Sequence, residues 1–227
     1  MNKNLTISLS ILAILAVVIT LGVFAYSGSD GEEASGPRPS APEAPPTASA
    51  ELLVRDDSRY LDRVEDAQVT VVEFLDFECE ACYAQFPVME RIREDYEGRI
   101  DVVIRYFPLP GHANSRPAAA AVEAAAQQDA LDEMYVRMFE TQPEWGESRE
   151  SQAELFIGFA EDLGLDVDEF TEVMESPETE ARVQADFDDG VELGVQGTPT
   201  IFVDGVRTSS MPSYEELSSR IDAGLGE

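Results

Sequence analysis

The pattern of hydrophobic and polar positions divides the chain into three parts. An almost unbroken apolar stretch covers residues 5–26, interrupted only by hydroxyl-bearing side chains. Residues 27–50 are rich in Ser, Gly, Ala and Pro, and residues 51–227 show the mixed periodicities of strands and helices. We therefore expect an apolar segment, an extended linker and one folded domain.

The apolar segment is long enough to cross a lipid bilayer. Its twenty-two residues would span about 33 Å as an α-helix, and the hydrocarbon core of a bilayer is about 30 Å thick. Lys3 precedes the segment and acidic residues follow it, which places residues 1–4 in the cytoplasm and the domain outside. We expect a single-pass signal-anchor over residues 5–26. A cleaved signal peptide, with Ala25-Tyr26-Ser27 as a poor cleavage site, is the alternative.

The first elements predicted in the domain are two strands joined by a helix. β-branched and aromatic residues are concentrated at 69–75, which predicts a buried strand. Apolar residues recur three or four positions apart from Cys82 to Tyr96, which predicts a helix that ends at Gly98. Residues 100–107 predict a second strand.

The remaining elements are a helical block and a hairpin followed by a helix. The block is expected to cover about residues 112–194. Asp204-Gly205 separates two short strand patterns and predicts a tight hairpin, and Pro212 is typical of the start of a helix. The helices expected from the periodicity are 117–128, 131–140, 152–163, 167–174, 178–193 and 213–221.

The charge of the chain excludes several classes of function. The sequence has 46 Asp and Glu against 15 Lys and Arg, a formal net charge of −31. Binding to nucleic acid requires clusters of Lys and Arg, so no nucleic-acid partner is expected. One His and two Cys are too few for a closed structural zinc site, so no metal is expected.

The two cysteines are the candidate reactive groups. Cys79 and Cys82 lie three positions apart where the first strand passes into the helix. A thiol at a helix start faces free backbone N–H groups, which lowers its pKa and makes Cys79 the expected nucleophile. Cys82 is expected to be the more buried, resolving thiol of a pair that exchanges disulfides. A permanent disulfide and half of a metal site are the alternatives, but the preceding strand and the lack of further ligands favour redox activity.

Two stretches of the sequence resemble the thioredoxin superfamily, and in particular its DsbA-like thiol–disulfide oxidoreductases. They are residues 72–82, which contain both cysteines, and Gly197-Thr198-Pro199-Thr200. Pro87 matches the helix-kinking proline of these enzymes, and the resemblance covers about residues 69–222. It implies an α/β thioredoxin fold with a helical insertion, which in this chain would be preceded by an N-terminal transmembrane helix.

The resemblance implies roles for three further residues. Thr198 and Pro199 correspond to the cis-proline loop that faces the cysteine pair and binds an extended substrate. Glu73 corresponds to a buried acid beneath the disulfide, where a raised pKa would allow it to take a proton from Cys82. A Glu73 side chain that points to solvent is the alternative.

The residues around Cys79 differ in charge from those of the related enzymes. Glu80-Ala81 stand between the cysteines, where DsbA itself has Pro-His. Glu80, together with Asp76 and Glu78, places negative charge near Cys79, which would destabilise the thiolate of Cys79. We therefore expect a less oxidising pair than that of DsbA, whose reduction potential is about −120 mV. The only histidine, His112, is expected to be a loop or helix-entry residue, with a modulatory role as the alternative.

These observations together predict an extracytoplasmic thiol–disulfide oxidoreductase at the cell membrane that forms disulfides in secreted or membrane proteins. Its substrates would be cysteine-containing protein segments, and no organic cofactor is expected. Turnover would require a membrane redox partner, for which a quinone-linked reoxidase is the expectation. A reductase or isomerase fed by a transmembrane electron carrier, and a non-catalytic binding module of the same fold, are the alternatives. The chain is expected to be a monomer.

Overall fold

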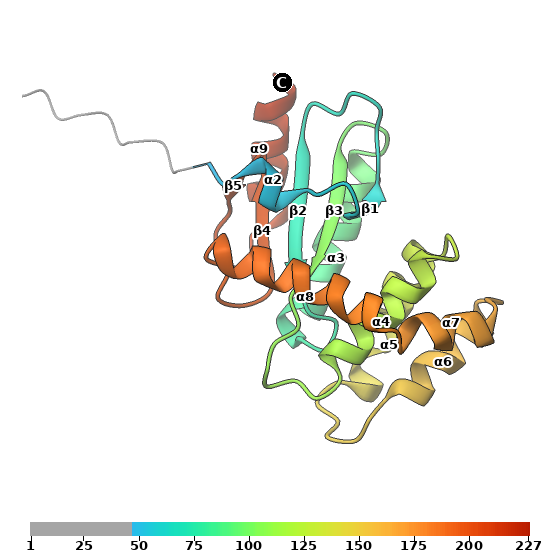
Figure 1. Ribbon diagram of the computed structural model, residues 1–227. Coiled ribbons are helices and arrows are strands. Elements are labelled where there is room, and N and C mark those ends of the chain that lie inside the picture. Colours follow the sequence, from blue (N-terminus) through green and yellow to red (C-terminus); the bar gives the residue numbers. More distant parts are fainter. Residues whose placement is uncertain (1–46) are drawn as a thin grey trace, which may run out of the picture. The chain divides into compact units, whose positions relative to one another are not determined.

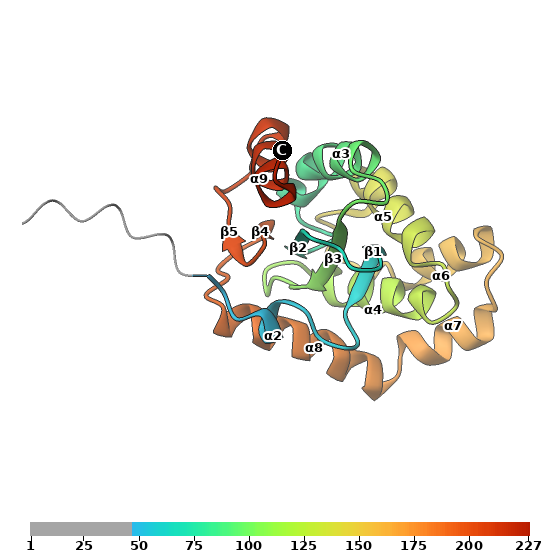
Figure 2. The ribbon, with the colours of Figure 1, turned by 90° about the horizontal axis from the view of Figure 1, so that it is seen from above.

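The computed structural model describes residues 47–227, which form a five-stranded mixed β-sheet with helices on both faces (Figures 1 and 2). The expected cytoplasmic residues 1–4, the expected anchor 5–26 and the linker up to residue 46 lie outside the described residues. Within residues 47–227, no helix combines the length and the apolar character needed to cross a membrane.

The sheet has the strand order β1-β3-β2-β4-β5. Its central strands, β2 (Thr70–Leu75) and β3 (Asp101–Tyr106), are parallel, and β4 (Thr200–Val203) lies antiparallel to β2. The edge strands β1 (Arg59–Asp62) and β5 (Val206–Arg207) are short. Both central strands are covered on their two faces, which is why their sequences are almost continuously apolar.

From α3 onward the helices follow the predicted order, whereas the short helix α2 was not predicted. Helix α3 covers Glu80–Asp95 and contains Pro87, and α7 has the predicted bounds, Val167–Met174. Helix α5 (Leu131–Trp145) continues past its expected end, because the fully buried Trp145 packs its ring against Phe156 with centroids 4.9 Å apart. The other helices are α2 (Ala50–Leu53), α4 (Ser115–Ala126), α6 (Ala153–Asp162), α8 (Pro177–Glu192) and α9 (Tyr214–Leu225).

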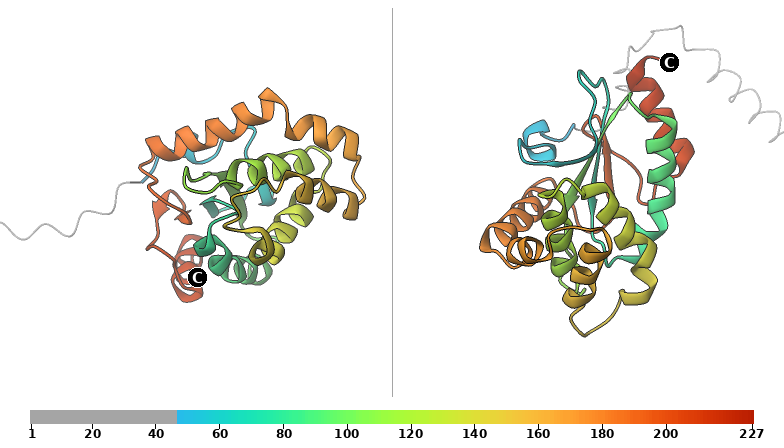
Figure 3. Two further views of the ribbon diagram at one scale, coloured as in Figure 1. Left: turned by 90° about the horizontal axis from the view of Figure 1, so that it is seen from below. Right: turned by 90° about the vertical axis from the view of Figure 1, so that its right-hand side faces the viewer.

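The helices cover the sheet in three groups. Figure 2 shows α3 and α9 on one face and α2 and α8 on the other. Met89 and Ile92 of α3 pack with Leu217 and Ile221 of α9 in one apolar cluster between these helices and the sheet. The predicted helical block, residues 112–194, is divided in the structure: helices α4 to α7 lie at the end of the sheet where β2 and β3 end (Figures 1 and 3), whereas α8 covers a face of the sheet. Helices α4 to α7 therefore stand beside the turn that carries the cysteines.

A buried arginine ties the sheet to the helices on one face. Arg105 in β3 is fully buried, and its guanidinium forms ion pairs with Asp186 and Asp189 of α8. The same side chain donates hydrogen bonds to the carbonyl oxygens of Leu52 and Leu53 in α2, both at 2.7 Å. Because a buried charge is stable only when its polar groups are paired, this cluster holds α2 and α8 against β3.

The substitution Asp186→Asn removes one charge from this buried cluster with little change in volume. We expect the free energy of unfolding to fall by about 3 kcal/mol, because Arg105 stays buried with one carboxylate partner fewer. Asp162→Asn, which breaks an exposed ion pair with Arg137, is the control and should change it by less than about 1 kcal/mol. Urea unfolding measures both effects. Equal losses in the two variants would contradict the role given to the cluster.

Candidate active site at the start of helix α3

The turn after β2 places both cysteines at the start of α3. Cys79 is the residue before the helix, with φ −74° and ψ 123°, and Cys82 lies in its first turn. The backbone N–H of Cys79 donates to the carbonyl oxygen of Asp76 at 3.1 Å, which closes the turn. Cys79 is 6% exposed, Cys82 is 1% exposed, and both are free thiols. The expected order of burial, with Cys82 the deeper residue, is confirmed.

The two thiols have opposite pKa shifts. The hydrogen bond from the Cys82 thiol, helped by the backbone N–H groups of Cys82 and Ala81, lowers the pKa of Cys79 to about 5 although burial opposes this. Burial, together with the neighbouring Cys79, raises the pKa of Cys82 well above its usual value. At neutral pH Cys79 is therefore a thiolate and Cys82 a thiol.

The segment before β4 lies against Cys79. The Thr198–Pro199 peptide bond is cis, and the sulfur of Cys79 lies 3.5 Å from the carbonyl oxygen of Thr198. The two residues are 119 positions apart, and the antiparallel pairing of β4 with β2 brings them together. The Thr198 hydroxyl is buried and has no hydrogen-bond partner within the described part of the chain.

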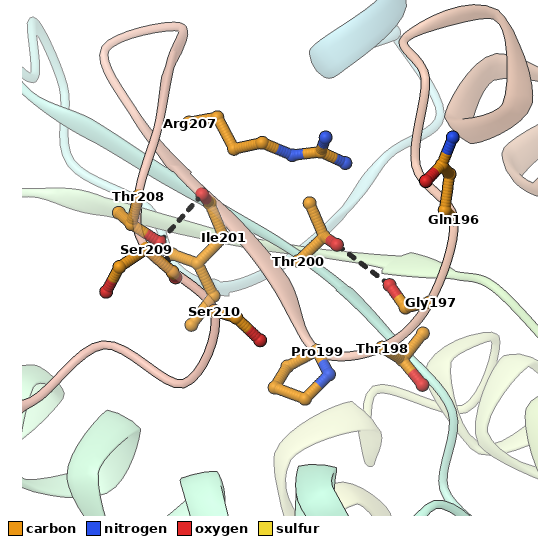
Figure 4. A pocket seen from close by; sticks show the side chains of 10 residues that line it. All are labelled: Gln196, Gly197, Thr198, Pro199, Thr200, Ile201, Arg207, Thr208, Ser209 and Ser210. Atoms are coloured by element: carbon orange, nitrogen blue, oxygen red, sulfur yellow. Dashed lines mark hydrogen bonds between the residues drawn. The ribbon is translucent and has the colours of Figure 1, made fainter.

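A cavity of about 410 Å³ opens beside this segment, between residues 196–201 and residues 207–210. Figure 4 shows the Thr200 hydroxyl turned to the carbonyl oxygen of Gly197, to which it donates a hydrogen bond at 2.8 Å. Strand β5 pairs only with the second half of β4. The cavity therefore adjoins the start of β4, at an edge that β5 does not cover.

Glu73 lies in the middle of β2. Its neighbours on the adjacent strands are Ile104 and Ile201, and it is 2% exposed. Burial, and in addition the charge of Glu90, raises the pKa of Glu73 to about 8. Burial and Cys79 are the main causes of the raised pKa of Cys82, and the charge of Glu73 adds to them. The expected burial of Glu73 is confirmed, and the alternative of a side chain in solvent is wrong.

The acidic residues near the cysteines have partners of their own. The buried Asp76 carboxylate accepts hydrogen bonds from the backbone N–H of Glu78 at 2.9 Å and of Leu109 at 3.0 Å. The Glu78 carboxylate accepts one from the N–H of Asn114 at 2.6 Å, whereas Glu80 is exposed. The negative charge expected from the sequence is thus partly compensated by loop N–H groups. Among residues 47–227, no group of three or more His, Cys, Asp or Glu side chains is arranged to hold a metal ion.

The loop after β3 brings His112 to the Asp76 carboxylate. Nδ1 of His112 lies 2.6 Å from Oδ2 of Asp76. Burial disfavours the charged imidazole, but the hydrogen bond and the charge of Asp76 outweigh it and raise the pKa of His112. Burial raises the pKa of Asp76 to about 6. The sequence contained a signal for this contact, because the segments that follow two neighbouring parallel strands meet at one edge of a sheet.

An aromatic cluster that was not expected from the sequence supports the cysteine turn. Phe77 and Phe86 pack against Tyr135 and Phe139 of α5, with ring centroids 5.2 to 6.2 Å apart. Gln142, on the same helix, donates a hydrogen bond to the carbonyl oxygen of Glu78 at 2.9 Å. These α5 residues recur three or four positions apart, so the helical periodicity was the signal that could have identified this face.

The sequence is similar to two kinds of bacterial protein. The Na(+)/H(+) antiporter NhaA of Herminiimonas arsenicoxydans is 33% identical over 163 residues, which are 70% of this chain and 24% of the antiporter. This chain thus spans about a quarter of the length of such relatives. The "Probable disulfide bond formation protein D" of Bacillus anthracis is 28% identical over 235 residues, which are 99% of this chain and 98% of that protein.

The fold and a family model agree with these similarities. The crystal structure of α-DsbA1 from Wolbachia pipientis superposes with a TM-score of 0.68 at 20% identity, over 77% of this chain and 94% of that one. The family model described as "Thioredoxin" matches residues 64–223, which include both cysteines and the Thr198–Pro199 segment. The chain therefore belongs to the thioredoxin family and has the fold of its DsbA-like members.

Proposed function

We propose that the chain is a thiol–disulfide oxidoreductase that forms disulfides in proteins outside the cytoplasm. The observation that carries the proposal is the placement of two free thiols at the start of α3, with the sulfur of Cys79 3.5 Å from the carbonyl oxygen of Thr198; the opposite pKa shifts of the two thiols support it. A thiolate that is stable at neutral pH is a good leaving group in disulfide exchange. The cysteine sulfurs carry the two electrons themselves, so the reaction needs no organic cofactor.

In the oxidising direction the Cys79–Cys82 disulfide accepts two electrons from a substrate dithiol. A substrate thiolate attacks the sulfur of Cys79, the bond to Cys82 breaks, and a mixed disulfide forms between the substrate and Cys79. A second substrate thiolate then attacks the substrate sulfur of that bond. The substrate leaves as a disulfide and Cys79 leaves as a thiolate, which its low pKa favours.

Glu73 is proposed to carry the proton that Cys82 exchanges. Because the pKa of Glu73 is about 8, the carboxyl is mostly protonated at neutral pH. It can protonate the Cys82 sulfur when that sulfur leaves the disulfide, and it can take the proton back when the disulfide is formed again. Because Cys82 is only 1% exposed, a buried carboxyl group is suited to exchange this proton with it.

Thr198 and Pro199 are proposed to bind the substrate. The carbonyl oxygen of Ile201 already accepts the backbone N–H of Thr208 at 2.9 Å, so the backbone before Ile201 is the part offered to an extended segment, and the adjoining cavity offers space for its side chains. A segment that pairs there would place its cysteine close to Cys79, since the carbonyl oxygen of Thr198 is 3.5 Å from that sulfur. Cysteine-containing protein segments in an extended conformation are therefore the proposed substrates.

The proposed location follows from the sequence pattern and from the relatives. Residues 1–4 would lie in the cytoplasm, residues 5–26 would anchor the chain in the cell membrane, and residues 27–50 would link the anchor to the extracytoplasmic domain 51–227. The name of the relative from Bacillus anthracis supports a role in disulfide formation. A monomer reoxidised by a quinone-linked membrane protein completes the proposal.

The substitutions Cys79→Ser and Cys82→Ser should separate the roles of the two thiols. Cys79→Ser is expected to abolish exchange with a peptide that contains a disulfide, because it removes the nucleophile. In Cys82→Ser the thiolate of Cys79 should attack the peptide disulfide, release one peptide sulfur as a thiolate and accumulate as a mixed disulfide, because no internal thiol remains to resolve it. Mass spectrometry of the non-reduced protein measures both outcomes. A binding module without exchange activity would form no mixed disulfide in either variant and would keep its partner in both.

The reduction potential of the Cys79–Cys82 pair should fall between those of thioredoxin and DsbA. The pKa of Cys79 is about 5. It lies between the pKa of the nucleophilic cysteine of thioredoxin, about 7, and that of the nucleophilic cysteine of DsbA, about 3.5. A lower thiolate pKa stabilises the reduced form, so we expect a potential between about −270 and −120 mV. Equilibration with glutathione measures it. A value above about −180 mV supports disulfide formation, whereas a value near about −270 mV favours a reductase fed by a transmembrane electron carrier.

The substitution Glu73→Gln should stabilise the protein in a pH-dependent manner and slow its exchange reaction. The unfolded chain releases the Glu73 proton near its ordinary pKa, but the folded protein keeps it up to about pH 8. The stability of the wild-type protein therefore falls between these values by about 1.4 kcal/mol per pH unit, and Gln removes this loss. Urea unfolding at several pH values and stopped-flow exchange measure the two effects. Glu97→Gln, at an exposed position in the turn that follows α3, is the control and should show neither.

A further inference from the structure

The loop between β3 and α4 fixes the only histidine of the sequence beside the cysteine turn. Nδ1 of His112 lies 2.6 Å from Oδ2 of Asp76, and the backbone N–H of His112 donates to the carbonyl oxygen of Leu109 at 3.1 Å. The N–H of Leu109 donates to the same carboxylate oxygen at 3.0 Å. The His112 side chain is only 23% exposed, so its ring is held by the loop and by Asp76 together.

Asp76 links this histidine to both cysteines. Its carbonyl oxygen accepts a hydrogen bond from the N–H of Cys79 at 3.1 Å, and its own N–H donates to the sulfur of Cys82 at 3.5 Å. A charge on the His112 ring therefore acts on Asp76, the residue whose backbone fixes the position of Cys79. His112 and Cys79 also interact through their charges, because the charge of Cys79 helps to raise the pKa of His112.

His112 is surrounded by acidic groups that no arginine neutralises. The groups whose charges act on its ring are Asp76, Glu78, Cys79, Glu80 and Glu147. Within residues 47–227, the arginine ion pairs involve none of these four carboxylates, and the single ion pair of Asp76 is the one with His112. Among the ion pairs of the described residues, the one between His112 and Asp76 is therefore the one that brings a basic side chain to this cluster of negative charge.

We infer that His112, whose Nδ1 lies 2.6 Å from the Asp76 carboxylate, is a positioning residue whose charged form supplies the positive charge that balances the Cys79 thiolate and the Asp76 carboxylate. The inference rests on the proposed function, in which the thiolate of Cys79 is the reactive form. The residues between the two cysteines, Glu80 and Ala81, contribute no positive charge. In the reduced protein, the positive charge near Cys79 comes instead from His112, in the loop between β3 and α4.

The coupling must be reciprocal. If the protonated ring stabilises the thiolate, the thiolate stabilises the protonated ring by the same free energy. When Cys79 and Cys82 form a disulfide, the thiolate disappears and this stabilisation of His112 is lost. The pKa of His112 should therefore depend on the redox state of the cysteine pair, which a histidine with a purely structural role would not show.

The first test is an NMR titration of His112 in the full chain, solubilised in a mild detergent. As the only histidine, it gives an unambiguous imidazole signal. We expect its pKa to be higher in the reduced than in the oxidised protein by about one unit, a tenfold change in proton affinity. Equal pKa values in the two redox states would overturn the inference.

The second test replaces the charge. His112→Gln should raise the pKa of Cys79 by about one unit and make the reduction potential more negative by about 30 mV, the value for a tenfold change in a two-electron couple. His112→Arg keeps a cation and should restore both values. Arg220→Gln, which removes a cation from an ion pair in α9, is the control and should leave both unchanged. The pH dependence of Cys79 alkylation and equilibration with glutathione measure the two quantities.

The outcomes distinguish this inference from the proposed function. If His112→Gln and His112→Arg shift the pKa of Cys79 equally, or if neither shifts it, the inference fails while exchange activity of the wild-type protein still supports the proposed function. If the wild-type protein shows no exchange with peptide disulfides, the proposed function fails. The NMR titration still decides whether His112 and Cys79 are coupled.

Discussion

The site depends on the parallel pairing of β2 with β3. The register runs from Thr70 opposite Asp101 to Leu75 opposite Tyr106, and the N–H of Phe107 donates to the carbonyl oxygen of Leu75 at 2.8 Å. The two strands therefore separate at the same level of the sheet. One continues into the turn with the cysteines, and the other continues into the loop with the histidine. The hydrogen bonds of the Asp76 carboxylate join these two segments where the strands end.

Local rules predicted the elements and the positions of the cysteines. The central strands are apolar on both faces, and the long helices have clear periodicity, so their order could be derived from the sequence. Strand β1 could not, because all four of its residues are half-buried and show no alternation. The burial of Glu73 was implied by the resemblance to DsbA-like enzymes, whereas the strand pattern alone left a side chain in solvent as the alternative. The contact between Asp76 and His112 joins residues 36 positions apart and depends on the conformation of a loop, which periodicity does not determine.

The excess of negative charge is handled differently in the core of the fold and at the site. In the fold, arginine compensates carboxylates, as Arg105 does for Asp186 and Asp189, and as Arg93 does for Asp62, Glu90 and Asp132. At the site, backbone N–H groups hold the Asp76 and Glu78 carboxylates. Hydrogen bonds from the backbone compensate charge without placing a large guanidinium beside the sulfur of Cys79, and this leaves the approach along β4 open.

Every basic side chain of the described domain other than His112 is an arginine. Guanidinium groups stay protonated at every pH that a protein tolerates, whereas lysine begins to lose its charge in alkaline solution. The ion pairs that hold β1, β3, α3 and α8 together are therefore insensitive to alkali. Cys79 and Asp76, with pKa values of about 5 and 6, lie in the turn after β2, and Glu73, with a pKa of about 8, lies within that strand. A change of environmental acidity near neutrality would thus act on the chemistry of this protein and, through Glu73, on its stability, while the arginine ion pairs stay as they are.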